Sequence, residues 1–271
     1  MQLKGKVALV TGAARGIGKG IALKLAAEGV NLALVDLPAS GETSLGYQLS
    51  DESLLKQTAR EVEAVGVRAV PVLADVTKPA DTQRMVAETM AAFGGVDILV
   101  NNAGVITMGT VMETSEAQWD TTMDVNVKGI FLGCQAAIPE LTKRGEGRIV
   151  NIASVAGKTG RAGVAAYCAS KFAVIGFTQA LAEELGPMNI TVNAGCPGFL
   201  RTAMWTEVIT KQLAKAWKID PSQVFDRFVR QSTYLRREQT PADIGECVVY
   251  LCRADNVTGE SINVAGGGDV H

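Results

Sequence analysis

Histidine is nearly absent from this chain of 271 residues, because the only one is His271, the last residue. The end of a chain is usually mobile, so this imidazole is poorly placed to act as a catalytic base or a metal ligand. A Ser–His–Asp hydrolase needs one firmly held histidine, and the H-E-x-x-H zinc motif needs two. The sequence therefore excludes both of these hydrolase classes.

Cysteine is also scarce, and no two of the five residues form a C-x-x-C pair. Such pairs are typical of zinc sites and redox centres, and an odd number does not suit a disulfide framework. We expect reduced thiols that pack as small core residues. They are Cys134, Cys168, Cys196, Cys247 and Cys252.

Charge and hydrophobicity give no sign of a nucleic-acid or membrane partner. The 26 lysines and arginines nearly balance 28 aspartates and glutamates, so no strongly basic surface is expected. No apolar run approaches the roughly 20 residues that span a bilayer. A strand-like segment begins within the first residues and leaves no room for a secretory signal. We expect a cytoplasmic protein.

Short apolar, β-branched runs alternate along the chain with longer segments of helical spacing. Parallel strands need crossover connections, so this alternation predicts an α/β fold with a parallel sheet covered by helices on both faces. No linker or repeat divides the chain, so residues 1–271 are expected to form one domain. The predicted strands are 6–11, 31–36, 68–73, 97–101, 148–153, 189–193 and 261–264, and the predicted helices are 17–28, 54–65, 81–93, 117–142, 165–185 and 241–253.

Two connections are longer than this scheme requires. Between Asp36 and Asp75 the chain has about ten residues more than a helix, a strand and short connections would use. We assign the surplus to an insertion at 38–50. The second long connection, 199–240, has apolar spacings typical of two short helices. It follows the sixth predicted strand, where a substrate lid is expected in an α/β enzyme.

The first predicted strand leads directly into the glycine-rich segment 11–18, and a helix follows. Glycines let the backbone approach a pyrophosphate closely, and the free N–H groups at the start of the helix can bind that anion. The spacing is G-x-x-x-G-x-G. Asp36, at the end of the second strand, can accept both ribose hydroxyls of NAD and would repel a 2′-phosphate. Arg15 could bind that phosphate, but the position of Asp36 favours NAD.

Tyr167 and Lys171 lie four residues apart in one predicted helix and therefore share a face. Alone, such a pair also fits an ordinary amphipathic helix. Beside a lysine ammonium and an oxidised nicotinamide, the phenol pKa would fall by roughly 2–3 units, which suits proton transfer. Ser154 follows the fifth predicted strand. Asn126 lies in the predicted helix 117–142. Its side chain either competes for the hydrogen bonds of the local backbone or belongs to a buried polar network.

In their order and spacing, these motifs resemble the short-chain dehydrogenase/reductase superfamily over nearly the whole chain. The resemblance implies a single-domain Rossmann fold with a seven-stranded parallel sheet, and hydride transfer between an alcohol carbon and a nicotinamide without a metal. By resemblance, Tyr167 donates or accepts the proton and Ser154 hydrogen-bonds the substrate oxygen. Lys171 would bind the nicotinamide ribose and lower the tyrosine pKa, and Asn126 would support a proton-relaying water. The matching pieces are 11–18, 75–76, 101–104, Asn126, Ser154, Tyr167, Lys171, 197–198 and Thr202.

The resemblance also implies cofactor contacts and an assembly. Asp75 and Val76 would border the adenine, and 197–202 would reach the nicotinamide carboxamide. Members are commonly tetramers assembled partly through the helix that bears Tyr167, so a homotetramer is implied. The expected NAD contacts are Gly12, Arg15, Gly16, Ile17, Gly18, Asp36, Asp75, Val76, Asn102, Ala103, Gly104, Tyr167, Lys171, Pro197, Gly198 and Thr202.

The insertion at 38–50 resembles one in a subgroup of this superfamily linked to mycofactocin and carveol oxidation, which holds NAD very tightly. The stretch 46–55 carries the likeness. If the likeness is functional, 38–50 would fold over the adenosine half of the cofactor and slow its exchange. The alternative is an ordinary surface loop.

The sequence leaves the substrate open among a secondary alcohol, a polyol and a hydroxy ketone. The predicted lid has eight lysines and arginines against four acidic residues, which could steer an anionic substrate or simply be solvated helix faces. Lys158 and Arg161 are equally ambiguous, whereas Phe199, Met204 and Trp205 suggest an apolar wall. Two other functions stay open: an NADPH-dependent 3-oxoacyl-type ketoreductase and a non-catalytic redox-sensing protein.

Overall fold

The computed structural model describes residues 1–37 and 51–270 and contains a seven-stranded sheet in the order β3-β2-β1-β4-β5-β6-β7. Every pairing in this sheet is parallel. The chain order reverses between β1 and β4, and α/β proteins bind ligands at such a point. The predicted insertion at 38–50 and His271 lie outside the described residues. The strands are β1 (Val7–Thr11), β2 (Asn31–Asp36), β3 (Ala69–Leu73), β4 (Ile98–Asn101), β5 (Gly147–Ile152), β6 (Ile190–Pro197) and β7 (Ser261–Val264).

The sixth strand is longer than its sequence predicts. We expected a strand over 189–193, whereas β6 continues to Pro197. Ala194 and Gly195 have little strand propensity of their own. They are strand residues here because β6 pairs with β5 on one side and with β7 on the other. This extension carries the chain to the ligand-binding edge of the sheet.

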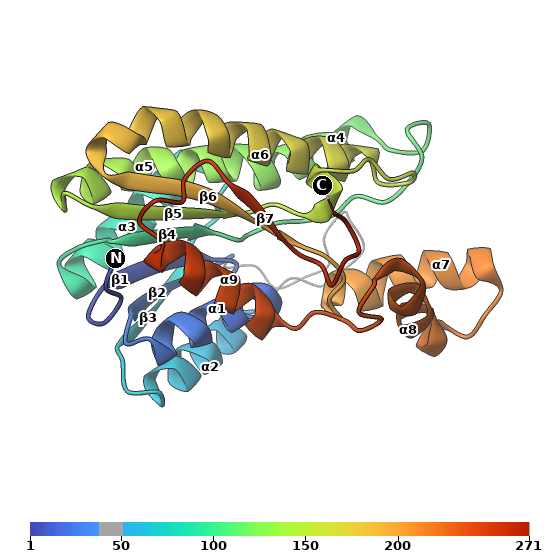
Figure 1. The fold of residues 1–271 in the computed structure, drawn as a ribbon, viewed down its shortest axis with the longest axis horizontal. Coiled ribbons are helices and arrows are strands. Elements are labelled where there is room, and N and C mark those ends of the chain that lie inside the picture. The colour runs from blue at the N-terminus through green and yellow to red at the C-terminus, as the bar shows by residue number, and fades with distance from the viewer. Residues whose placement is uncertain (38–50, 271) are drawn as a thin grey trace.

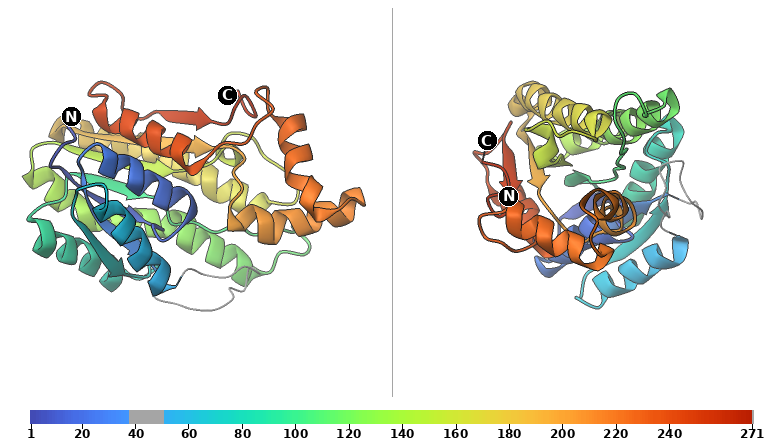
Figure 2. Two further views of the ribbon diagram at one scale, coloured as in Figure 1. Left: turned by 90° about the horizontal axis from the view of Figure 1, so that it is seen from below. Right: turned by 90° about the vertical axis from the view of Figure 1, so that its right-hand side faces the viewer.

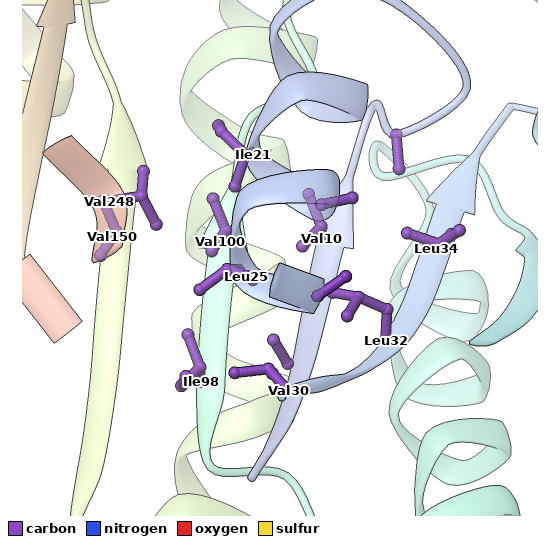
Figure 3. Packing of buried hydrophobic residues seen from close by; sticks show 14 of the residues in the cluster. Val10, Ile21, Leu25, Val30, Leu32, Leu34, Ile98, Val100, Val150 and Val248 are labelled. Atoms are coloured by element: carbon purple, nitrogen blue, oxygen red, sulfur yellow. The ribbon is translucent and has the colours of Figure 1, made fainter. Parts of the chain in front are cut away.

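Helices cover both faces of the sheet, as the alternating pattern predicts (Figure 1). On one face, Ile21 and Leu25 pack against Val10 and Val100, and Val248 belongs to the same buried cluster (Figure 3). That face is covered by α1 (Gly16–Ala27), α2 (Glu52–Glu63) and α9 (Pro241–Arg253). The opposite face is covered by α3 (Pro79–Phe93), α5 (Gly129–Lys143) and α6 (Ala165–Leu185).

The long helix predicted at 117–142 is interrupted. It consists of α4 (Glu116–Met123), a π-helical turn (Asp124–Lys128) and α5. A π-turn adds one residue to the helical register, and such turns often mark functional sites. Here the turn carries Asn126, whose side chain is fully buried.

The two short helices expected between β6 and the last helix are present. They are α7 (Thr210–Trp217), which continues a π-helical segment (Met204–Ile209), and α8 (Pro221–Ser232). They lie together beyond one end of the sheet, apart from the two helix layers (Figure 2). Phe199, at the base of this lid, packs edge-on against Trp205 and Phe228 with centroid distances of 5.9 and 4.8 Å. This aromatic cluster gives the lid its own small core.

All five cysteines are unpaired, and all except the partly buried Cys247 are buried, as expected for small core residues. Within residues 1–37 and 51–270, no helix is both long enough and apolar enough to cross a membrane.

Candidate active site

A cavity of about 980 Å³ lies where the carboxyl ends of the strands meet the lid. Its walls come from the segments that follow β1, β2, β3, β4, β5 and β6, because parallel strands bring all these segments to one edge. Segments that are distant in sequence therefore meet around one space. Of the expected site residues, those that line it are Gly12, Arg15, Ile17, Asp36, Asp75, Val76, Asn102, Ala103, Gly104, Ser154, Tyr167, Lys171, Pro197, Gly198 and Thr202.

The glycine-rich turn after β1 is packed too closely to hold larger residues. Gly12 has a φ of +66°, and a Cβ there would lie 2.8 Å from Nδ2 of Asn102. A Cβ on Gly18 would overlap the carbonyl oxygen of Gly12. Asn102 fixes this turn, because its amide donates to the carbonyl oxygens of Thr11 and Gly12 at 2.9 and 3.0 Å. Gly16, Gly18 and Asn102 thus shape the turn, and Gly16 begins α1.

Asp36 ends β2 at the rim of the cavity. Its carboxylate accepts hydrogen bonds from the backbone N–H groups of Ala14 and Leu37, each at 2.8 Å. Burial raises the pKa of Asp36, while these two bonds and the charge of Arg15 lower it. The bond to Ala14 joins the end of β2 to the glycine-rich turn, so the acid and the turn form one surface.

Ser154 and Tyr167 lie on the opposite part of the cavity wall. Ser154 follows β5, and its hydroxyl accepts a hydrogen bond from the N–H of Ala156 at 3.1 Å. Tyr167 stands in the first turn of α6 and is only 9% exposed. The Ser154 side chain hydrogen-bonds Tyr167. Two hydroxyl groups are thereby presented together to the cavity.

Lys171 and Asn126 lie behind these hydroxyls. The Lys171 ammonium donates to the carbonyl oxygen of Ile152 at 2.8 Å. A Cβ on Gly104 would lie 3.2 Å from Oδ1 of Asn126 and 3.6 Å from Nζ of Lys171, so both groups meet at this glycine. Asn126 is thus part of a buried network, one of the two alternatives that the sequence left open.

Ser170 completes that network, although sequence reasoning did not single it out. Asn126 Nδ2 donates to Oγ of Ser170 at 3.0 Å and to the carbonyl oxygen of Val105 at 2.9 Å. The Ser170 hydroxyl donates to the carbonyl oxygen of Tyr167 at 2.7 Å. Asn126 is therefore fixed from both sides, and its amide is tied to the helix turn that carries Tyr167. The signal in the sequence was a serine directly before Lys171, on the inner face of α6.

Comparison with known proteins agrees with this geometry. The family model of the short chain dehydrogenases matches residues 6–213. Over 265 residues, the chain is 35% identical to a diacetyl reductase, (S)-acetoin forming, of Staphylococcus epidermidis, covering 97% of this chain and 98% of the relative. The chain belongs to the short chain dehydrogenase family.

Two solved structures of this fold hold different cofactors. Carveol dehydrogenase from Mycobacterium avium, in complex with NAD, matches with a TM-score of 0.93 and 31% identity, covering 98% of each chain. Actinorhodin polyketide ketoreductase with NADPH matches with a TM-score of 0.89 and 35% identity, covering 100% of this chain and 99% of the other. As a short chain dehydrogenase, the protein is an oxidoreductase that uses a nicotinamide cofactor.

The cavity of this short chain dehydrogenase has the features that such a dinucleotide needs. Gly12 and Gly18 keep side chains out of the turn, so the backbone can approach a pyrophosphate. The side chain of Arg15, the N-cap residue of α1, does not cap this helix, so the first N–H groups of α1 can bind an anion. Asp36 stands at the end of β2, where a ribose is bound in this type of fold. These residues fit the adenosine and pyrophosphate parts of the cofactor.

Burial dominates the pKa values of Tyr167 and Lys171 in the protein alone, whereas the sequence-based prediction concerned Tyr167 with an oxidised nicotinamide beside it. Burial raises the pKa of Tyr167 to about 12, against which the Ser154 hydrogen bond acts only partly. Burial also lowers the pKa of Lys171 to about 8. The ammonium lies 5.7 Å from the centre of the Tyr167 ring and donates to a backbone carbonyl.

The lid contributes an apolar wall and none of its basic side chains. Phe199, Met204 and Trp205 line the cavity, as the sequence suggests, together with further apolar residues of the lid. Arg201 instead pairs with Asp226 and Glu238 at 2.5 and 3.6 Å. Among the described residues that line the cavity, the cationic ones are Arg15, Arg161 and Lys171. The excess of basic residues in the lid thus does not charge the cavity wall.

Proposed function

We propose that this short chain dehydrogenase transfers a hydride between NAD(H) and a secondary alcohol or its ketone. The observation that carries the proposal is the grouping of Ser154, Tyr167 and Lys171 in the cavity wall, with the buried Asn126 behind them beside Gly104. Tyr167 and Ser154 are the acid–base and hydrogen-bonding groups, and Lys171 and Asn126 act behind them. Such an arrangement has no evident use in a protein that only senses cofactor.

In the proposed mechanism, Ser154 hydrogen-bonds the substrate oxygen and Tyr167 exchanges a proton with it through Oη. A bound nicotinamide supplies the hydride donor or acceptor. Burial raises the pKa of Tyr167 to about 12, so the phenol is protonated at neutral pH and has a proton to give to the alkoxide that forms during ketone reduction. Lys171, with a pKa near 8, can exchange protons close to neutral pH. Asn126 holds the backbone beside Lys171, where a relaying water would bind.

Asp36 supports NAD in preference to NADP, because a 2′-phosphate would meet this carboxylate. In the variant Asp36→Asn, the acceptor oxygen for the Ala14 or Leu37 N–H is kept while the negative charge is removed. We expect the ratio of kcat/KM with NAD to that with NADP to fall at least about tenfold, which corresponds to roughly 1.4 kcal/mol. Steady-state kinetics with both cofactors measure this ratio. The exposed Asp120→Asn is the control, and an unchanged ratio in Asp36→Asn would assign the choice to Arg15 or to the insertion.

A second candidate is an NADPH-dependent ketoreductase of the 3-oxoacyl type. Arg15 favours it, because this side chain lines the cavity and lies near enough to Asp36 to lower the pKa of that carboxylate. The similarity to a polyketide ketoreductase with NADPH agrees with this alternative. Faster turnover of 3-oxoacyl thioesters with NADPH than of any alcohol with NAD would establish it.

The test of the proposed function is absorbance at 340 nm with NAD or NADP across secondary alcohols, polyols, hydroxy ketones and hydroxy acids. The apolar lid wall favours substrates with an apolar body, since unpaired polar groups are costly to bury. We therefore expect the highest kcat/KM with an apolar secondary alcohol and NAD. Lack of turnover across the panel by folded protein, with no cofactor released on denaturation, would contradict the proposal. Cofactor released on denaturation would instead support its retention beneath 38–50.

We also propose the homotetramer that the family resemblance implies. Trp119 on α4, Phe131 on α5 and Phe172 on α6 are 43%, 46% and 47% exposed. Large exposed aromatic side chains favour burial against another copy of the chain. Light scattering after size-exclusion chromatography tests this assembly, and a monomer at micromolar concentration would refute it. The cytoplasmic location stays a prediction from the sequence.

A further inference from the structure

The segment that follows β7 forms one wall of the cavity. Gly268 lines the cavity, and a Cβ on this residue would lie 2.9 Å from Cε2 of Phe199. Gly267 has a φ of +80°, and a Cβ there would lie 2.6 Å from the ring of Tyr234. The glycines at 266–268 thus let the chain pass close to the base of the lid, where larger residues would not fit.

Asp269, directly after these glycines, turns its carboxylate inward. The side chain is only 2% exposed and pairs with the Arg161 guanidinium at 3.6 Å. A buried carboxylate is tolerated when a cation compensates it, and such a pair holds its two segments in one relative position. The backbone is held as well, because Asn263 at the end of β7 donates to the carbonyl oxygen of Asp269 at 3.3 Å.

Arg161 belongs to the loop between Ser154 and Tyr167, which bounds the substrate side of the cavity. Its backbone N–H donates to Sγ of Cys168, the residue after Tyr167, at 3.4 Å. Lys158 of the same loop donates to the carbonyl oxygen of Ser261 in β7 at 2.6 Å. The loop is therefore fastened to β7 and to the segment after it at two points.

The same loop is also joined to the segment that follows β4, which lines the cavity as well. Gly109 N–H donates to the carbonyl oxygen of Gly163 at 2.9 Å, and Gly109 forms a bridge with Val164. Displacement of the loop would consequently move both Val164 and the segment around Met108, which line the cavity. Its position decides how a substrate approaches the two hydroxyl groups.

We propose that segment 266–269 is part of the active site and that Asp269 is a positioning residue, which acts through Arg161 on the loop between Ser154 and Tyr167. The kinetic effect expected of Asp269 rests on the proposed function. Removing the Asp269 charge releases Arg161, so the substrate is held less well over the hydroxyl groups. The glycine-rich turn and Asp36, which fit the adenosine and pyrophosphate parts of the cofactor, do not contact this loop, so we expect cofactor affinity to be kept.

The variants Asp269→Asn and Arg161→Met test this role in the full-length protein. We expect each to lower kcat/KM for the alcohol at least tenfold, mainly through KM, with NADH affinity within twofold of the parent. The double variant should lose no more than the more damaging single variant, because the two residues act as one pair. Arg161→Lys, which keeps the cation, should recover part of the loss seen in Arg161→Met. The control is Glu246→Gln, which removes an ion-paired carboxylate between α1 and α9, remote from the cavity lining.

A structural measurement separates this inference from the proposed function. Hydrogen–deuterium exchange of peptides covering 155–164 should be at least tenfold faster in Asp269→Asn than in the parent protein, with no change in α1 or α9. This result does not depend on any turnover. Unchanged exchange, or additive kinetic losses in the double variant, would overturn the positioning role. If Asp269→Asn fails to fold, the Arg161 variants serve instead, because the side chain of Arg161 is half-exposed. Kinetics and hydrogen–deuterium exchange of these variants then decide the question.

Discussion

Replacing Tyr167 by phenylalanine is expected to lower kcat by about 10³-fold, in the range that loss of a general acid–base group causes. The phenyl ring keeps the shape of the buried side chain, so the fold and the affinity for NADH should be retained. The hydroxyl that is lost is the one that hydrogen-bonds Ser154 at the cavity wall. Residues 1–37 and 51–270, which the structure describes, contain no histidine that could take over proton transfer. Steady-state kinetics and NADH fluorescence titration measure the two effects separately.

Two further variants make this result specific. Tyr250→Phe removes a hydroxyl from a tyrosine that is 53% exposed on α9, and its kcat should not change. Ser154→Ala should also lower kcat, since the substrate oxygen loses a hydrogen-bond donor. If Tyr167→Phe retained more than a tenth of the parent turnover, Tyr167 would not be the proton donor or acceptor.

Replacing Lys171 by methionine is expected to abolish activity and yet stabilise the protein at pH 7. Burial lowers the pKa of this ammonium from 10.5 to about 8, so folding with a charged Lys171 costs roughly 3 kcal/mol. Methionine also loses the hydrogen bond from Lys171 to the carbonyl oxygen of Ile152, which lowers the free energy of unfolding by about 1 kcal/mol. We expect a net stabilisation of about 2 kcal/mol, or a Tm higher by about 5 °C.

The pH dependence of this stabilisation gives a second test. The folded-state pKa is lowered, so the folded protein binds the proton less tightly than the unfolded chain does. The cost of the charge is present in full below the folded-state pKa near 8 and disappears above the usual lysine pKa of 10.5. In thermal unfolding without added cofactor, the difference in Tm between Lys171→Met and the parent protein should therefore decrease between pH 8 and pH 10.5. The same increase in Tm at pH 7 and above pH 10.5 would contradict the view that the buried Lys171 charge destabilises the protein. An equal increase in the exposed Lys128→Met would contradict it as well.

Much of the fold and of the cofactor site follows from local features of the sequence. The strands over 31–36 and 261–264 and the helices over 165–185 and 241–253 have the predicted bounds, because hydrophobic period and end signals coincide there. The glycine-rich turn, Asp36, Ser154 and Tyr167 reach one edge because the carboxyl ends of parallel strands all lie there. For these residues, position along the chain was sufficient to predict position in the site.

Other features depended on contacts between distant segments. Strand β6 extends beyond its predicted end because it has a partner on each side, and the π-turn at Asn126 is held by bonds to Val105 and Ser170. The pKa of Tyr167 is raised because burial outweighs the hydrogen bond from Ser154. Asp269 is a further case, since its carboxylate meets a loop more than a hundred residues earlier. The sequence by itself determined the family, the layout of the sheet and the kinds of chemical groups at its edge. Only the tertiary structure decided which groups touch, how deeply they are buried and hence how strongly they hold their protons, because these properties depend on packing between segments remote from one another in the chain.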